Sequence, residues 1–182
     1  FNAAQYYYQN NNPVWSLIYA EQYINLEPYS AKSVDLRKLM IDAYRAVFSG
    51  VASDKLPDFN KNNNTVNGAK ESFAKVVQDI LIKNGGVIAS GLNTETLTML
   101  RTRFILDWNT LYSSQFSSTL FTYQDKLLRS GNFDCYNQWL FGAISDSQEY
   151  GIWLKNNSQI FSKFENWKQN NLMLPTASDP RP

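Results

Sequence analysis

The stretch from Asn93 to Gln115 constrains the fold most, because its apolar residues recur with the spacing of one helical face. A separation of three or four residues links Leu97, Leu100, Phe104, Trp108 and Leu111, as in an amphipathic helix. Asn93 or Thr94 can cap the first turn, in which the helix dipole favours the carboxylate of Glu95. The stretch therefore predicts a helix over about 94–115, which we expect to be the longest in the fold.

The rest of the chain repeats this helical spacing, and no useful length of it alternates in the manner of a strand. Turn-forming residues separate the apolar stripes at Asn10–Pro13, Pro28, Gly50, Asn84–Gly86 and Gly131. The sequence therefore predicts an all-α fold of roughly eight or nine helices with no sheet.

A polar interval divides these helices. Residues 51–68 end in an Asn-rich run with the composition of turns, which predicts a surface loop. We expect one all-α domain over 1–174, in which this loop separates a hairpin stack at 1–50 from a helical bundle at 69–174. The final segment, 175–182, contains three prolines and no large apolar residue, which predicts a flexible tail.

Residues 1–30 combine two short helices, a tight turn and a closing Leu-x-Pro. Small and aromatic residues mark the two helices and their end, namely Ala4, Tyr7, Ser16, Ala20, Tyr23, Leu26 and Pro28. This outline resembles a tetratricopeptide repeat, although the first helix lacks the Trp and Leu that open that motif. The resemblance implies an α-α superhelix, a tetratricopeptide-like helical array, whose concave surface binds a peptide or a partner protein. It implies no catalysis.

The chain contains no histidine, which excludes Ser-His and Cys-His nucleophiles, histidine bases and histidine-containing zinc sites. Its one cysteine, Cys135, cannot form an intrachain disulfide or a four-cysteine metal site. Apolar neighbours predict that Cys135 is a small buried hydrophobe. The glycine-rich segment 85–91 lacks the Gly-Lys-Ser/Thr of a phosphate loop and predicts a helix connector. We therefore expect no metal and no cofactor.

Carboxylate pairs are the enzymatic option that remains. Asp134 and Asp146 flank an aromatic helix, and a glycosidase needs two carboxylates at a defined separation. Both residues are explained as helix-start residues, so we expect that the protein is not an enzyme. Arg101, Arg103 and Asp107 predict a solvated face, on which Arg103 can pair with Asp107 four residues later.

The candidate binding residues are aromatic side chains and a neighbouring amide: Tyr136, Asn137, Trp139, Trp153 and Trp167. Flat apolar rings beside hydrogen-bonding amides can stack on a sugar or grip a peptide. The alternative is that the three tryptophans lie at the centres of helical stripes and simply pack together. The first hypothesis is a non-enzymatic scaffold that binds a protein or peptide. The alternative is an exported small-ligand or glycan-binding module that uses surface Tyr and Trp.

Charge and composition bound the partners and the location. The net charge of +1, from 17 basic and 16 acidic residues, gives no electrostatic signature of nucleic-acid binding. No run of 18 apolar residues is present, so we expect no transmembrane segment. The weakly charged, Asn- and Tyr-rich composition is compatible with export to a periplasm or the extracellular space. No signal peptide is visible, and the start at Phe1 without a methionine predicts a processed or trimmed N-terminus.

Overall fold

The computed structural model describes residues 1–49 and 72–182, and these residues contain helices and no strand. The elements are α1 (Asn2–Gln9), α2 (Pro13–Leu26), α3 (Ala31–Ser49), α4 (Phe73–Lys83), the 3₁₀ turn η2 (Gly85–Ile88), α5 (Thr94–Leu111), α6 (Thr119–Arg129), α7 (Phe133–Asn137), the π turn η3 (Gln138–Gly142), α8 (Ala143–Ser145), α9 (Ser147–Asn156) and α10 (Ser158–Asn170). Because α7, η3 and α8 follow without a break, the described residues hold nine helices. The all-α prediction is confirmed, whereas the loop predicted at 51–68 lies outside the described residues.

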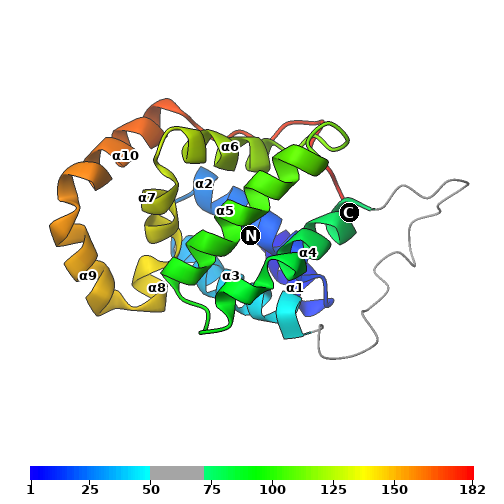
Figure 1. Ribbon diagram of the computed structural model, residues 1–182, viewed down its shortest axis with the longest axis horizontal. Coiled ribbons are helices and arrows are strands. Elements are labelled where there is room, and N and C mark those ends of the chain that lie inside the picture. Colours follow the sequence, from blue (N-terminus) through cyan, green and yellow to red (C-terminus); the bar gives the residue numbers. More distant parts are fainter. Residues whose placement is uncertain (50–71) are drawn as a thin grey trace, which may run out of the picture.

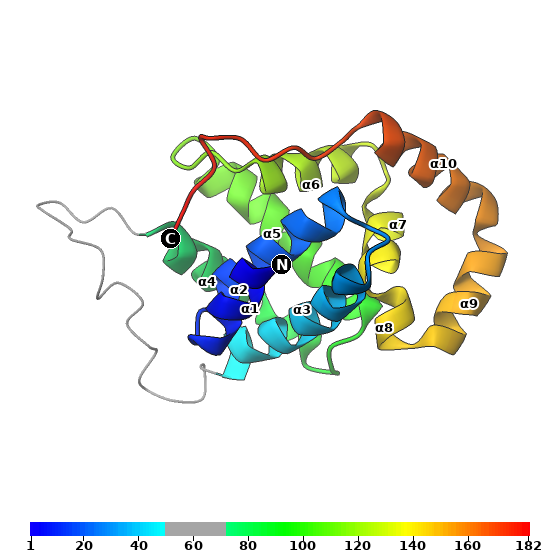
Figure 2. The ribbon, with the colours of Figure 1, turned by 180° about the vertical axis from the view of Figure 1, so that it is seen from behind.

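Helix α2 is the centre of the fold, with α1, α3 and α4 packed against it (Figures 1 and 2). Nine of its 14 residues are buried, so it is apolar around most of its circumference, as a core helix must be. Asn11 adopts a φ of 54° in the turn between α1 and α2, a left-handed conformation that asparagine tolerates better than most residues. This turn lets the short α1 fold back and cover α2.

The helix predicted over 94–115 is present as α5, but it ends at Leu111. At 18 residues it is one residue shorter than α3, which has 19, so the prediction that it is the longest helix is wrong. Asn93 caps its start by accepting a hydrogen bond from Thr96 N, and the Thr96 side chain accepts one from Asn93 N. The predicted face is buried up to Trp108, whereas Leu111 is exposed because the chain turns away immediately afterwards.

Aromatic rings join the central helices. The ring of Phe73 on α4 lies 5.3 to 5.8 Å from four other rings, which belong to Trp15, Trp108, Phe116 and Phe121. Edge-to-face and stacked pairs at such distances stabilise a core beyond the burial of their area. One continuous cluster of buried apolar residues therefore extends from α1 to the segment after α10.

The segment after α10 runs along α6 toward α4 (Figures 1 and 2). Met173 is buried in the core cluster. Asp179 accepts hydrogen bonds from the backbone N–H groups of Thr119, at 2.5 Å, and Thr176, at 2.6 Å. These contacts attach residues 171–182 to the first turn of α6, where a helix favours a carboxylate. The flexibility expected of residues 175–182 stays a prediction.

Helices α9 and α10 form an outer arm on the side of α7 and α8 (Figure 1). Helix α9 has no fully buried residue, and α10 has one, Phe164. The arm is therefore joined to the rest of the protein through few side chains. None of the helices in the described ranges is both long and apolar enough to cross a bilayer.

Candidate binding cleft

A cleft of about 360 Å³ opens where the start of α5 meets η3, α8 and α9. Figure 1 shows the start of α5 beside α8. The walls come from the start of α5 (Asn93, Thr94, Glu95), from η3 (Gln138, Gly142) and from the α8–α9 turn with α9 (Ser145, Asp146, Glu149, Tyr150, Trp153). We call this site the acidic cleft. Its volume lies near the lower end of the range of sites that bind small molecules.

The π turn η3 shapes one wall of the acidic cleft. A π turn adds a residue to the helical turn, and such turns occur frequently at functional sites. Within η3, a Cβ atom built on Gly142 would overlap the ring of Tyr150 and lie 2.8 Å from the Gln138 Oε1 atom. A larger residue at position 142 would therefore force the side chain of Tyr150 or Gln138 to move. The close approach of Tyr150 to Gly142 holds the far wall of the cleft in place.

Carboxylates dominate the charge of the acidic cleft. Its lining residues include Glu95, Asp146 and Glu149, and no lysine or arginine. None of these three takes part in an ion pair formed within the described residues. Asp146 caps α9, because its Oδ1 atom accepts from the N–H groups of Gln148 and Glu149 at 2.9 Å. Glu95 lies in the first turn of α5 and Glu149 in that of α9, positions that the helix dipole stabilises.

Two aromatic rings of α9 line the same cleft. The rings of Tyr150 and Trp153 lie 6.5 Å apart with an angle of 8° between their planes. Trp153 is half-buried and meets Phe161 edge to face at 5.9 Å, which fixes its orientation. Burial raises the pKa of the Tyr150 hydroxyl, so this group is neutral at physiological pH. The cleft therefore offers ring faces, a neutral hydroxyl and carboxylates together.

The structure separates the five candidate binding residues that the sequence predicts. Tyr136 and Asn137 are completely buried. The Tyr136 hydroxyl donates to Glu21 at 2.8 Å and accepts from the Asn25 amide at 2.6 Å, while the Asn137 amide donates to Phe133 O at 2.7 Å. Neither side chain exposes a surface to a ligand in this structure, and both serve the packing of α7.

The three predicted tryptophans are half-buried and lie in three different environments. Trp153 lines the acidic cleft. Trp167 packs on Tyr123, with 5.8 Å between ring centroids, and Trp139 lies against the cations of Arg37 and Lys168. Of the five predicted residues, Trp153 alone lines the cleft. Sequence reasoning did not select Gly142 or Tyr150, although a glycine within a helical segment is a signal of close packing.

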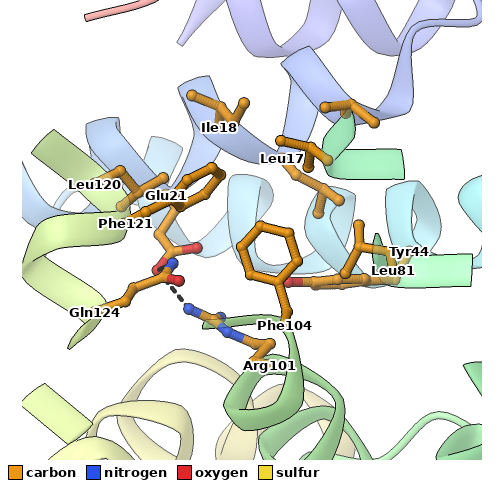
Figure 3. A pocket seen from close by; sticks show the side chains of 12 residues that line it. Leu17, Ile18, Glu21, Tyr44, Leu81, Arg101, Phe104, Leu120, Phe121 and Gln124 are labelled. Carbon is orange, nitrogen blue, oxygen red and sulfur yellow. Dashed lines mark hydrogen bonds and ion pairs between the residues drawn. The ribbon is translucent and has the colours of Figure 1, made fainter. Parts of the chain in front are cut away.

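A buried polar cluster joins α2, α5, α6 and α7 next to a small pocket of about 30 Å³, and Figure 3 shows Glu21, Arg101 and Gln124 of this cluster. Glu21 Oε1 accepts hydrogen bonds from Arg101 Nη2 at 2.5 Å, from Gln124 Nε2 at 2.8 Å and from the Tyr136 hydroxyl. Burial alone would lower the pKa of Arg101, but the charge of Glu21 and the hydroxyls of Tyr44 and Tyr136 raise it above its ordinary value. Arg101 and Glu21 therefore form a buried ion pair.

The buried pair corrects one prediction from the sequence. Arg101, expected on a solvated face, is 1% exposed, and Glu21 is 3% exposed. Asp107 pairs with Lys83 at 3.0 Å and with the Asn84 amide at 2.9 Å, and no ion pair joins it to Arg103. The i,i+4 spacing indicated a local partner, but Asp107 pairs instead with Lys83 at the end of α4. Arg101 Nε and Nη1 have no hydrogen-bond partner among the described residues, and the adjoining cavity has room for a water molecule.

The remaining chemical candidates have structural roles. Asp134 is exposed in the first turn of α7, and Asp146 caps α9. Cys135 is buried, as predicted, and burial raises the pKa of its thiol, which disfavours the reactive thiolate. Across residues 1–49 and 72–182, no group of three or more metal-ligating side chains is placed to hold a metal ion.

The chain was compared with known proteins in three ways. No protein-family model matches it, and neither a curated protein nor a solved structure matches it. The resemblance of residues 1–30 to a tetratricopeptide repeat therefore stays a prediction.

Proposed function

We propose that this protein is a non-enzymatic helical scaffold for a protein or peptide partner, and that the acidic cleft receives a basic side chain of that partner. The observation that carries the proposal is the combination of three carboxylates with two aromatic rings in one cleft that no lysine or arginine lines. A lysine or arginine of a partner would meet opposite charge at Glu95 and Glu149. It would also meet a ring face at Trp153, and cations are attracted to such faces.

The location of the cleft supports a binding role. Its walls are built from helix starts and a π turn, and the Asn93 and Asp146 caps order the first turns of α5 and α9. The backbone of a capped helix start is already ordered, so it loses little conformational entropy when a ligand binds. The resemblance of residues 1–30 to a tetratricopeptide repeat is a further reason to propose a scaffold. We include this tetratricopeptide-like relation in the proposal.

The test is a titration followed by tryptophan fluorescence, because Trp153 lines the cleft. We expect a tetralysine peptide to give a saturable change and a tetraglutamate peptide to give none. Glu149→Gln should weaken binding by about threefold to tenfold, as expected for the loss of one charge-assisted contact in a partly exposed site. The matched control is Glu27→Gln, which makes the same change at an exposed residue outside the cleft. Equal affinities for the two peptides, or equal effects of the two substitutions, would refute the proposal.

The second candidate is a glycan-binding module, and Gln138 beside Trp153 in the cleft favours it. An indole face and an amide together suit a sugar ring, and the exported location predicted from composition would fit such a ligand. A panel of neutral oligosaccharides separates the two candidates, because glycan binding should be lost in Trp153→Ala and be almost unchanged in Glu149→Gln. Hydrolysis of any oligosaccharide in the panel would contradict the non-enzymatic role.

A further inference from the structure

Two cations from different helices meet at the ring of Trp139. The guanidinium carbon of Arg37, on α3, lies 4.8 Å from the centroid of this ring, and Lys168 Nζ, on α10, lies 4.3 Å from it. All three side chains are half-buried. Attraction between each cation and the indole holds the two charged groups at one place on the surface. We call these three residues the Trp139 basic cluster.

Neither cation of the cluster has a carboxylate partner among the described residues. Arg37 and Lys168 are absent from the ion pairs formed there. Arg37 Nη1 makes one long hydrogen bond, 3.4 Å to Pro28 O, and its Nε atom is buried with no hydrogen-bond partner in the described ranges. The donors of the guanidinium are therefore only partly used, and a buried donor without a partner is unfavourable.

The two positive charges also act on each other. Burial lowers the pKa of Lys168, and the nearby charge of Arg37 lowers it further. Burial is also the main cause that lowers the pKa of Arg37. The hydroxyls of Tyr136, Tyr150 and Tyr29 act in the opposite direction and raise this pKa. Two partly desolvated cations without a counter-ion destabilise the folded state. A bound anion would remove this repulsion.

We propose that the Trp139 basic cluster binds an oxyanion of the phosphate class between Arg37 and Lys168. The guanidinium fork matches two oxygens of a tetrahedral phosphate, and the lysine ammonium supplies a second point charge. A phosphate dianion neutralises both cations, whereas a carboxylate neutralises one. The oxyanion can be free phosphate or a phosphate monoester carried by a larger ligand. None of the three cluster residues lines the acidic cleft, whose charge has the opposite sign, although Arg37 lies close enough to Tyr150 of that cleft to interact with it electrostatically.

The experiment is calorimetric titration of the full chain with sodium phosphate, phenyl phosphate and sodium acetate at constant ionic strength. We expect saturable binding of the two phosphates and weaker binding of acetate. Lys168→Gln and Arg37→Gln should each weaken phosphate binding about tenfold or more, because each removes a charge-assisted contact. Lys163→Gln is the matched control, since it removes the same charge from an exposed position of α10 outside the cluster and should bind phosphate as the unchanged protein does.

The calorimetric titrations distinguish the possible ligands and can overturn the proposal. Tighter binding of phenyl phosphate than of free phosphate supports a monoester as the ligand, and equal binding supports the free ion. The proposal is overturned if neither phosphate gives saturable heat, or if Lys168→Gln binds phosphate as tightly as Lys163→Gln. Circular dichroism of each variant shows whether it is folded, and Lys168→Gln decides the question if Arg37→Gln proves unfolded.

Discussion

Neutralising Glu21 should destabilise the protein far more than neutralising a charge on its surface. In Glu21→Gln the new amide oxygen can still accept from Gln124 and Tyr136, so the change isolates the loss of charge. Arg101, at 1% exposure, would then be a buried cation without the counter-charge that lies 2.5 Å away in the native protein. Removing one partner of such a pair costs about 3–5 kcal/mol, against about 0–1 kcal/mol for an exposed pair.

Urea unfolding is the suitable assay, because Trp15 and Trp108 are buried and their fluorescence reports the loss of the core. The expected loss corresponds to a fall of about 2 M in the urea midpoint, with an unchanged slope. Coincident transitions by fluorescence and circular dichroism test whether the unfolding is two-state. Lys83→Gln serves as the control, since its ion pair with Asp107 has a lysine side chain that is 62% exposed.

The double variant Glu21→Gln/Arg101→Met, compared with the two single variants Glu21→Gln and Arg101→Met, forms a double-mutant cycle. It leaves no unpaired charge in the core, so it should be more stable than Glu21→Gln alone by about 1 kcal/mol or more. The reasoning is refuted if Glu21→Gln costs no more than Lys83→Gln, because Arg101 would then reach water in the folded protein. It is also refuted if the effects of the two single substitutions simply add in the double variant.

Two further predictions concern the core. Trp108→Ala should cost about 3–5 kcal/mol in urea unfolding, because the ring is 2% exposed and packs on Phe104 and Phe121, and a loss below about 1 kcal/mol would contradict its burial. Burial raises the pKa of Tyr44 to about 12, whereas an unfolded tyrosine has a pKa of about 10. Between these two values the hydroxyl keeps its proton in the folded state and loses it in the unfolded state. The stabilisation from Tyr44 is therefore complete below about pH 10 and is lost as the pH rises toward 12. Tyr44→Phe should make the decline in unfolding free energy above about pH 10 shallower, and an unchanged decline would contradict the assignment.

Sequence reasoning located the helices well and the candidate site poorly. Residue type alone predicted a cap at Asn93 or Thr94 and a helix start at Asp146, and the structure has caps at Asn93 and Asp146. Trp153 lines the acidic cleft, but Tyr136 and Asn137, which belonged to the same predicted set, are buried in the core. An aromatic residue in a helical stripe has the same local pattern whether it packs inside or contacts a ligand, so spacing cannot separate the two roles.

The sequence by itself determined the helical character of the chain, because helix hydrogen bonds and caps join residues that are close along the chain. It also excluded histidine chemistry and an intrachain disulfide through composition. Only the tertiary structure decided which faces meet. Glu21 and Arg101 are 80 residues apart in the sequence and in direct contact, and Arg37 and Lys168, from different helices, both lie against the ring of Trp139. Such contacts depend on how whole helices pack, since the spacing within one helix specifies its apolar face but not the helix that covers it.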